Sequence, residues 1–149
     1  YHPLTDNIIV SANLFLKTIN SLDDDVRVSK RVNVPGRRLR GFESGKIGPK
    51  DGSQYIGGNY ASSLNLNSTL PNVFFENENV DFNFFIDLAN VWEVDYNNSL
   101  DSNKIRSSTG FAVNWFSAIG PLSFSYAIPL SEANTDITEK FRFQIGTSF

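Results

Sequence analysis

GRRLRGFESGKIG, residues 36–48, is a glycine- and arginine-rich stretch set between segments in which apolar and polar residues alternate. Its four glycines let the backbone turn tightly, while Arg37, Arg38 and Arg40 each need hydrogen-bond acceptors. The wider segment 26–50 carries eight cationic side chains against Glu43 alone, although the whole chain has a net charge of −3. A loop of this composition has to be held by an interior, and we expect the rest of the chain to supply the acceptors.

The segments around this stretch alternate with a period of two residues, which predicts strands. One face of most of them is apolar and rich in Phe, Trp and Tyr, and the other face is small or polar. Turn signals such as Gly120-Pro121 separate them. Seven strands are expected, over residues 7–18, 26–34, 56–70, 82–92, 105–115, 122–130 and 141–149.

Such strands fit either a transmembrane antiparallel β-barrel or a soluble β-sandwich. Aromatic residues near the strand ends and Gly, Ala, Ser and Asn on the opposite faces favour the barrel, with the apolar face in lipid and the small face in the lumen. An open sheet in lipid leaves edge N–H and C=O groups unsatisfied. Because the chain also starts at Tyr1 without a leader, we expect residues 1–149 to be the C-terminal portion of a larger all-β barrel, with its first strands upstream.

Enzymatic chemistry has little support in this sequence. His2 is the only histidine and there is no cysteine, which leaves nothing for a histidine triad or a thiolate metal site. Phe42 and Glu43 stand where a phosphate-binding loop needs Lys-Ser/Thr, and Asp23-Asp24-Asp25 is more typical of a charged turn than of a calcium site. The cationic segment lacks the stacking aromatics of a nucleic-acid site. We therefore expect no enzyme activity, no metal, no cofactor and no nucleic-acid partner.

Asp87 is the acceptor that the arginines are expected to meet. Strand parity places it on the same face as Asn65, Asn67 and Asn114, which is the lumen face of a barrel. A lone carboxylate or a lone guanidinium is costly there, whereas a bidentate pair between them would fix the loop. Lumen water, or an arginine of the next strand such as Arg106, remains an alternative partner.

Several short motifs stand in a specific order and spacing along the chain. They are LRGF (39–42), IGP (47–49), IGGN (56–59), FFID (84–87), GPLSFSYA (120–127) and FRFQIGTSF (141–149). Together they resemble the barrel of the BamA family of outer-membrane assembly proteins, also called the bacterial surface antigen family. The resemblance implies that this chain holds the last seven strands of a sixteen-stranded barrel, without the periplasmic POTRA domains.

The resemblance also implies a role for the glycine- and arginine-rich loop, at about residues 35–55. In the family this loop folds into the lumen, where its arginine meets acidic groups of the wall. The implied latch consists of Arg40, Gly41, Phe42 and Asp87, with Arg37 and Arg38 in support. Asn67 stands where many members place a glutamate, so the latch would depend more heavily on Asp87.

The function implied by the resemblance is that of a non-enzymatic insertase, which folds outer-membrane barrel precursors through a lateral seam beside its last strand. Phe141, Phe143, Gly146 and Phe149 match the terminal strand signal of the family, where glycine weakens or kinks the strand. The expected partners are outer-membrane lipid, unfolded outer-membrane protein precursors and periplasmic assembly lipoproteins, at the outer membrane of a Gram-negative bacterium. A two-partner-secretion or TamA-like translocation pore of the same superfamily is an alternative, as is a passive porin.

Overall fold

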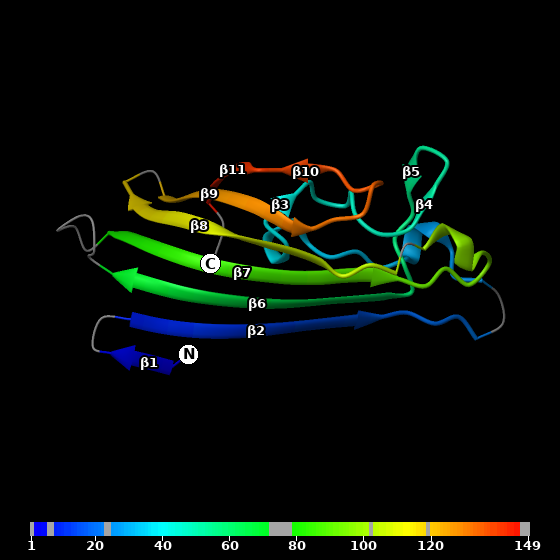
Figure 1. Ribbon diagram of the computed structural model, residues 1–149, viewed down its shortest axis with the longest axis horizontal. Helices are drawn as coiled ribbons and strands as arrows, with labels where there is room; N and C mark the ends of the chain where they lie inside the picture. The colour runs from blue at the N-terminus through cyan, green and yellow to red at the C-terminus, as the bar shows by residue number, and fades with distance from the viewer. Residues whose placement is uncertain are drawn as a thin grey trace.

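The computed structural model describes residues 2–5, 8–22, 25–71, 79–101, 103–118 and 120–146. In these residues a 7-stranded antiparallel sheet has the strand order β1-β2-β6-β7-β8-β9-β11 (Figure 1). Its strands are β1 (His2–Thr5), β2 (Ile8–Thr18), β6 (Tyr60–Pro71), β7 (Val80–Trp92), β8 (Arg106–Ser117), β9 (Gly120–Ser131) and β11 (Phe141–Ile145).

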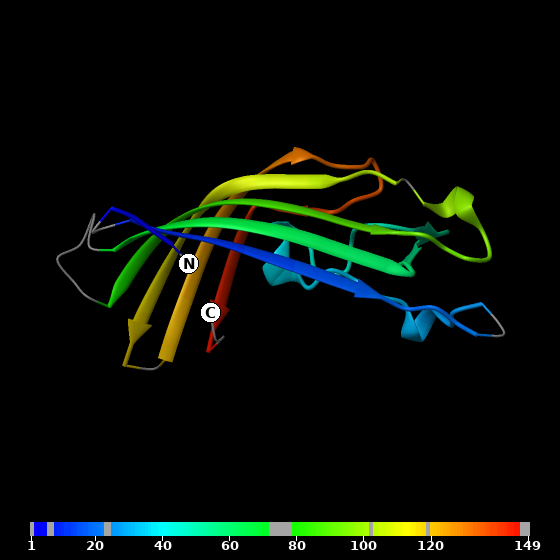
Figure 2. The ribbon, with the colours of Figure 1, turned by 90° about the horizontal axis from the view of Figure 1, so that it is seen from below.

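The segment between β2 and β6 supplies most of the remaining elements, and we call residues 25–59 the inner loop. Figure 2 shows the sheet as an arch with the inner loop against its concave side. The short elements are the 3₁₀ helices η1 (Val28–Lys30), η2 (Gly36–Arg38) and η3 (Asn98–Leu100) and the strands β3 (Gly41–Phe42), β4 (Lys50–Asp51), β5 (Gln54–Tyr55) and β10 (Thr138–Glu139). Strand β4 pairs with β5, and β3 pairs with β10.

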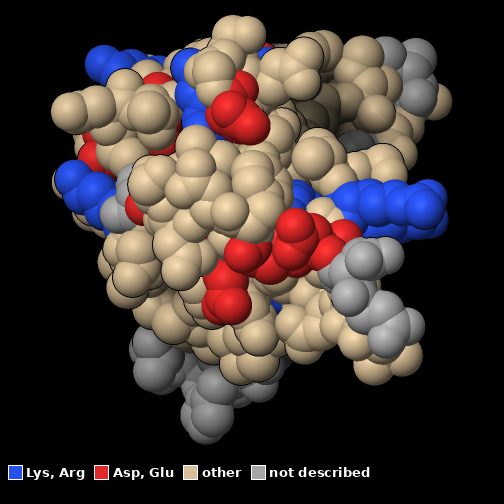
Figure 3. All heavy atoms as spheres, turned by 90° about the vertical axis from the view of Figure 1, so that its right-hand side faces the viewer, with Lys and Arg blue, Asp and Glu red and all other residues tan. Residues whose placement is uncertain are grey.

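The convex face of the sheet is apolar and exposed. One row in register consists of Phe84, Phe111, Tyr126 and Phe141, one residue from each of four neighbouring strands. All four side chains are exposed, and the rings of Phe111 and Tyr126 lie 5.7 Å apart. The loops at one end of the sheet instead carry charged side chains of both signs (Figure 3). This division agrees with the expected apolar face for lipid.

The hydrophobic core lies between the inner loop and the concave face of the sheet. The loop contributes Val32, Val34, Leu39, Phe42 and Ile47, and the sheet contributes Ala61, Ala89 and Val91. The two alanines on the sheet leave room for the loop backbone. The loop itself comes close to the sheet at Gly48, where an added Cβ would lie only 2.8 Å from the Cβ of Val91.

One predicted strand is wrong. Residues 26–34 do not form a strand, because residues 28–30 are the helix η1 and Val32 makes only an isolated bridge to Gly58. The alternation of valine with polar residues arises because this segment lies on the sheet, with Val26, Val32 and Val34 buried. The seventh strand of the sheet is β1 instead.

The other six predicted strands correspond to strands of the sheet, within about four residues at their ends. Strand β11 ends at Ile145, and Thr147 to Phe149 lie outside the described residues, as do Asp23 and Asp24. Among the residues that are described, no helix is long and apolar enough to cross a membrane.

Candidate functional site: a latch between the inner loop and the sheet

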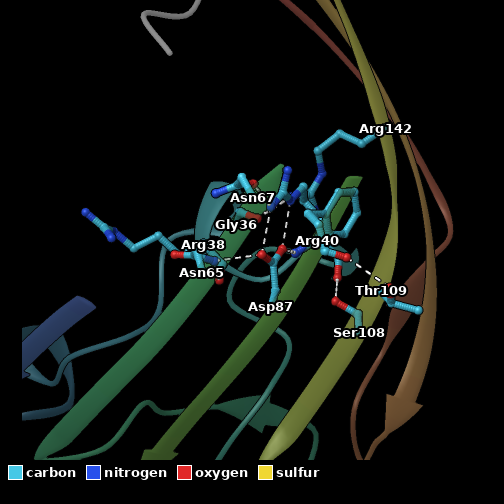
Figure 4. Close-up of polar contacts among 10 residues, drawn as sticks. Gly36, Arg38, Arg40, Asn65, Asn67, Asp87, Ser108, Thr109 and Arg142 are labelled. Atoms are coloured by element: carbon cyan, nitrogen blue, oxygen red, sulfur yellow. Dashed lines mark hydrogen bonds and ion pairs between the residues drawn. The ribbon is translucent and has the colours of Figure 1, made fainter. Parts of the chain in front are cut away.

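Asp87 occupies the centre of the concave face. It lies on β7 in register with Asn65 on β6 and Ser108 on β8, and its side chain is 0% exposed. Its Oδ2 accepts hydrogen bonds from the Arg40 backbone N–H at 3.0 Å and from Arg40 Nε at 2.7 Å. Its Oδ1 accepts from Arg40 Nη2 at 2.7 Å and from Asn65 Nδ2 at 2.9 Å (Figure 4). Each carboxylate oxygen thus accepts two hydrogen bonds. The Arg40 guanidinium binds both oxygens side-on, in the bidentate geometry that makes arginine–carboxylate pairs strong.

Arg40 has further contacts on three sides. Its Nη2 donates to Asn67 Oδ1 at 2.7 Å, and its guanidinium carbon lies 3.5 Å from the centroid of the Phe85 ring. Its carbonyl oxygen accepts a hydrogen bond from Ser108 Oγ. The side chain is 16% exposed, so this cation is largely desolvated and its charge is met by Asp87. We call Arg40, Asp87 and Asn67 the latch.

Phe85 and Gly110 form the floor on which Arg40 lies. The two residues are in register on β7 and β8, and Phe85 packs with Ala112 and Ala127. A Cβ at Gly110 would lie 2.9 Å from Phe85 Cζ and 2.0 Å from the carbonyl oxygen of Tyr126. Any larger residue at 110 would therefore displace the ring or the neighbouring strand. The expectations from sequence did not include Phe85 or Ser108 in the site.

The other loop residues expected in the latch have different environments. Phe42 is 1% exposed in the core, and Gly41 has φ of +90°, with an added Cβ falling 3.1 Å from Ala127 Cβ. The Arg38 carbonyl accepts from Asn65 Nδ2 at 2.7 Å, and its guanidinium carbon lies 4.7 Å from the Phe15 ring centroid. Arg37 is exposed at the edge of a cavity of about 780 Å³ on the concave face.

Arg106, the alternative partner for Asp87, pairs elsewhere. It is fully buried, and its Nε and Nη2 donate to the two carboxylate oxygens of Asp136 at 2.9 and 3.1 Å. Its Nη1 donates to Asn90 Oδ1 at 2.8 Å. The structure therefore separates two inner-face ion pairs, Arg40 with Asp87 and Arg106 with Asp136.

A third ion pair holds the start of the inner loop. Arg31 contacts Asp95 and donates to Asn59 Oδ1 at 2.8 Å, and the Val26 N–H donates to Asp95 Oδ2 at 2.6 Å. Burial raises the pKa of Asp95, but the hydrogen bonds from Val26, Arg31 and Asn59 lower it by more, to about 2. Among the described residues no group of three or more His, Cys, Asp or Glu side chains is placed to hold a metal ion.

The terminal strand contributes both an outward and an inward face. Phe141 and Phe143 are exposed on the convex side, and Phe143 stacks on Phe124 at 4.7 Å between centroids. Gly146 has φ of +70°, and its N–H donates to the Pro121 carbonyl at 2.8 Å. Phe149 lies outside the described residues.

Arg142, which the expectations from sequence did not include, points inward from β11 and donates to the backbone of the inner loop. Its position between two outward-facing residues indicated that its side chain points inward. Its acceptors in the inner loop are main-chain carbonyls, which the sequence does not mark.

Comparison with known proteins agrees with this architecture. A family model described as the Omp85 superfamily domain matches residues 1–149. Outer membrane protein assembly factor BamA of Neisseria meningitidis is 32% identical over 139 residues, covering 74% of this chain and 17% of that protein. BamA of Nitratidesulfovibrio vulgaris is 29% identical over 133 residues, covering 84% and 16%. The chain thus spans about a sixth of these curated relatives.

A solved structure is similar over nearly the whole chain. The crystal structure of BamA from Haemophilus ducreyi lacking POTRA domains 1–3 matches with a TM-score of 0.84 and 31% identity, covering 95% of this chain and 32% of that one. The match confirms the expected all-β barrel class and favours it over a sandwich. The relatives' names also agree with the expected location in the outer membrane of a Gram-negative bacterium.

The position within a sixteen-stranded barrel stays a prediction. Because the family model covers every residue from 1 to 149, the chain belongs to the Omp85 superfamily.

Proposed function

We propose that the protein containing this chain assembles outer-membrane proteins by inserting β-barrel precursors, without enzymatic chemistry and without a cofactor. The similarity to two BamA proteins supports an assembly role in general terms. The observation within the chain that carries the proposal is the buried latch, in which Arg40 and Asp87 hold the inner loop against the concave face. A loop fixed in this way fills the lumen side with the apolar core of Leu39, Phe42 and Ile47, which is unsuited to a passive pore.

Strand β11 is the proposed place of action. It has 5 residues, whereas the strands from β2 to β9 in the large sheet have 11 to 13, and in the described residues it pairs only with β9. A strand this short offers few N–H and C=O groups to a neighbouring strand on its other side, so that side can open and pair with an incoming precursor strand by β-augmentation. The substrates are accordingly unfolded outer-membrane precursors. Lipid meets the convex aromatic face, and periplasmic lipoproteins remain the proposed accessory partners.

The test is reconstitution of the full-length protein into lipid vesicles, followed by addition of a urea-unfolded outer-membrane barrel. Folding is measured by the change in electrophoretic mobility of unheated samples. We expect faster folding than in empty vesicles, and slower folding with Asp87→Asn than with wild type. Asp81→Asn is the matched control, because Asp81 also faces inward from β7 but lies outside the latch.

Two results would contradict this function. Ion conductance that Asp87→Asn leaves unchanged, with no acceleration of folding, would indicate a passive porin. Transfer of a soluble passenger into the vesicles, again without accelerated folding, would indicate a translocation pore of the two-partner or TamA-like type.

A further inference from the structure

Arg142 lies on β11 between the outward-facing Phe141 and Phe143, and its side chain reaches from the last strand to the inner loop (Figure 4). Its Nη1 donates to the Gly36 carbonyl at 2.6 Å and its Nη2 to the Phe42 carbonyl at 2.6 Å. Its Nε donates to Glu139 Oε2 at 2.9 Å. Since the side chain is only 13% exposed, these contacts are largely shielded from water.

The two carbonyl acceptors lie on either side of Arg40. Gly36 begins η2 and Phe42 ends β3, so Arg142 spans the turn that presents Arg40 to Asp87. A single guanidinium can do this because its donors are fixed in one plane and diverge, which the ammonium of lysine cannot reproduce. A Cβ at Gly36 would lie 3.0 Å from Arg142 Nη1, so the glycine leaves the space that the guanidinium uses.

Backbone pairing joins the same two regions. Gly41 and Phe42 of β3 pair with Glu139 and Thr138 of β10, which immediately precedes β11. Beyond this pair, the Glu43 N–H donates to the Ile137 carbonyl at 2.9 Å, and the Ile137 N–H donates to the Lys46 carbonyl at 3.1 Å. The turn carrying Arg40 is therefore bonded both to the sheet centre and to the beginning of the last strand.

We propose that Arg142 is a positioning residue that couples the latch to the last strand. When Arg40 is docked on Asp87, Arg142 holds β11 to the seated turn. When the latch opens, the Gly36 and Phe42 carbonyls move away and the β11 edge is loosened. This inference rests on the proposed function, because that edge is where the precursor would pair.

The test is amide hydrogen exchange of residues 141–146 in the folded full-length protein in detergent. Arg142→Ala should raise their exchange about tenfold, which corresponds to about 1.4 kcal/mol of local stability. Arg142→Lys should restore little of the protection, because one ammonium cannot hold both carbonyls. Lys140→Ala, which removes an exposed cation from the same hairpin, is the matched control and should leave exchange at the wild-type rate.

The coupling is tested by a double mutant. Arg40→Met alone should also raise exchange in residues 141–146, and in the Arg142→Ala background it should add nothing further, because the connection is already lost. Exchange in these residues that is unchanged by Arg142→Ala, or that rises by the product of the two single effects, overturns the proposal.

The same variants in the vesicle assay separate this inference from the proposed function. Arg142→Ala should change the rate of precursor folding while Lys140→Ala does not. If wild type accelerates no folding although exchange responds as expected, the insertase function fails and the coupling stands. If wild type accelerates folding but Arg142→Ala leaves the exchange of residues 141–146 unchanged, the coupling fails and the function stands.

Discussion

The charge pair at the centre of the latch can be tested by exchanging each partner for a neutral side chain of similar shape. Asp87→Asn keeps the volume but places an amide NH₂ against donors of Arg40 or Asn65, where the carboxylate accepts four hydrogen bonds. Removing one partner of a buried pair costs about 3–5 kcal/mol. We expect the lower end, about 3 kcal/mol, because Arg40 is 16% exposed and keeps its contacts with Asn67 and Phe85.

The consequence is measured by limited trypsin cleavage after Lys46. Cleavage there requires the loop to leave the sheet, because the Lys46 carbonyl is hydrogen-bonded to the Ile137 N–H and Ile47 is buried. When opening is fast relative to cleavage, the rate follows the open population, so about 3 kcal/mol becomes a rise of roughly 100-fold. Arg40→Met should give a similar rise, since it leaves Asp87 buried and unpaired.

The double variant decides whether the two residues act as a pair. Arg40→Met with Asp87→Asn should cleave no faster than either single variant, because no unpaired charge is left. Since each single change costs about 3 kcal/mol, this corresponds to a coupling of about 3 kcal/mol or more. Independent, additive effects of the two changes would refute the latch. Asn67→Ala, which removes one hydrogen bond to the guanidinium, should raise cleavage by about tenfold.

Three other changes have expected outcomes. Gly110→Ala should lower the folded yield, measured by electrophoretic mobility, because its Cβ would lie 2.0 Å from the Tyr126 carbonyl, whereas Gly45→Asn, with open space around it, should fold normally. Phe85→Leu should raise cleavage after Lys46 several-fold, since it removes a cation–π contact of about 0.5–2 kcal/mol. The start of the inner loop should lose protection from exchange, corrected for intrinsic rates, as pH falls from about 4 to about 2. In this pH range Asp95, whose pKa is lowered from an ordinary 3.8 to about 2, becomes protonated. The stabilisation that its carboxylate provides is complete above about pH 4 and is lost as the pH falls to about 2. The same pH profile in Asp95→Asn as in wild type would contradict this.

Alternation predicted the main strands because each of them faces two different environments. In β6, Leu64 and Leu66 point outward while Asn65 and Asn67 point to the concave face, and the sequence records this directly. The same reasoning gave a false strand at residues 26–34. Alternation indicates that a segment has one buried side and one exposed side, which is also true of a loop that lies on a sheet. In residues 26–34 the side chain of Val32 is buried, but the backbone makes only an isolated bridge and no strand pairing.

The sequence predicted which face of the sheet carries the site, but not which side chains pair there. Parity placed Asp87 on the concave face, yet it could not choose among three arginines. That choice came from the resemblance. In the structure Arg37 is exposed on η2, and the turn after η2 directs Arg40 to the sheet. The partners of Arg142 in the inner loop could not have been assigned from sequence, because they are main-chain carbonyls that every residue possesses.

The contacts between the last strand and the inner loop have a consequence for the order in which the protein itself folds. Arg142 and its acceptors, Phe42 and Gly36, are 100 and 106 residues apart in sequence. Contacts of such separation form late, since the intervening chain must be ordered first. The loop can approach Asp87 as soon as β6 and β7 are paired, but it becomes fully secured only when β11 is in place. Seating of the loop therefore marks the completion of this end of the chain, and an incomplete molecule would keep its trypsin sites accessible.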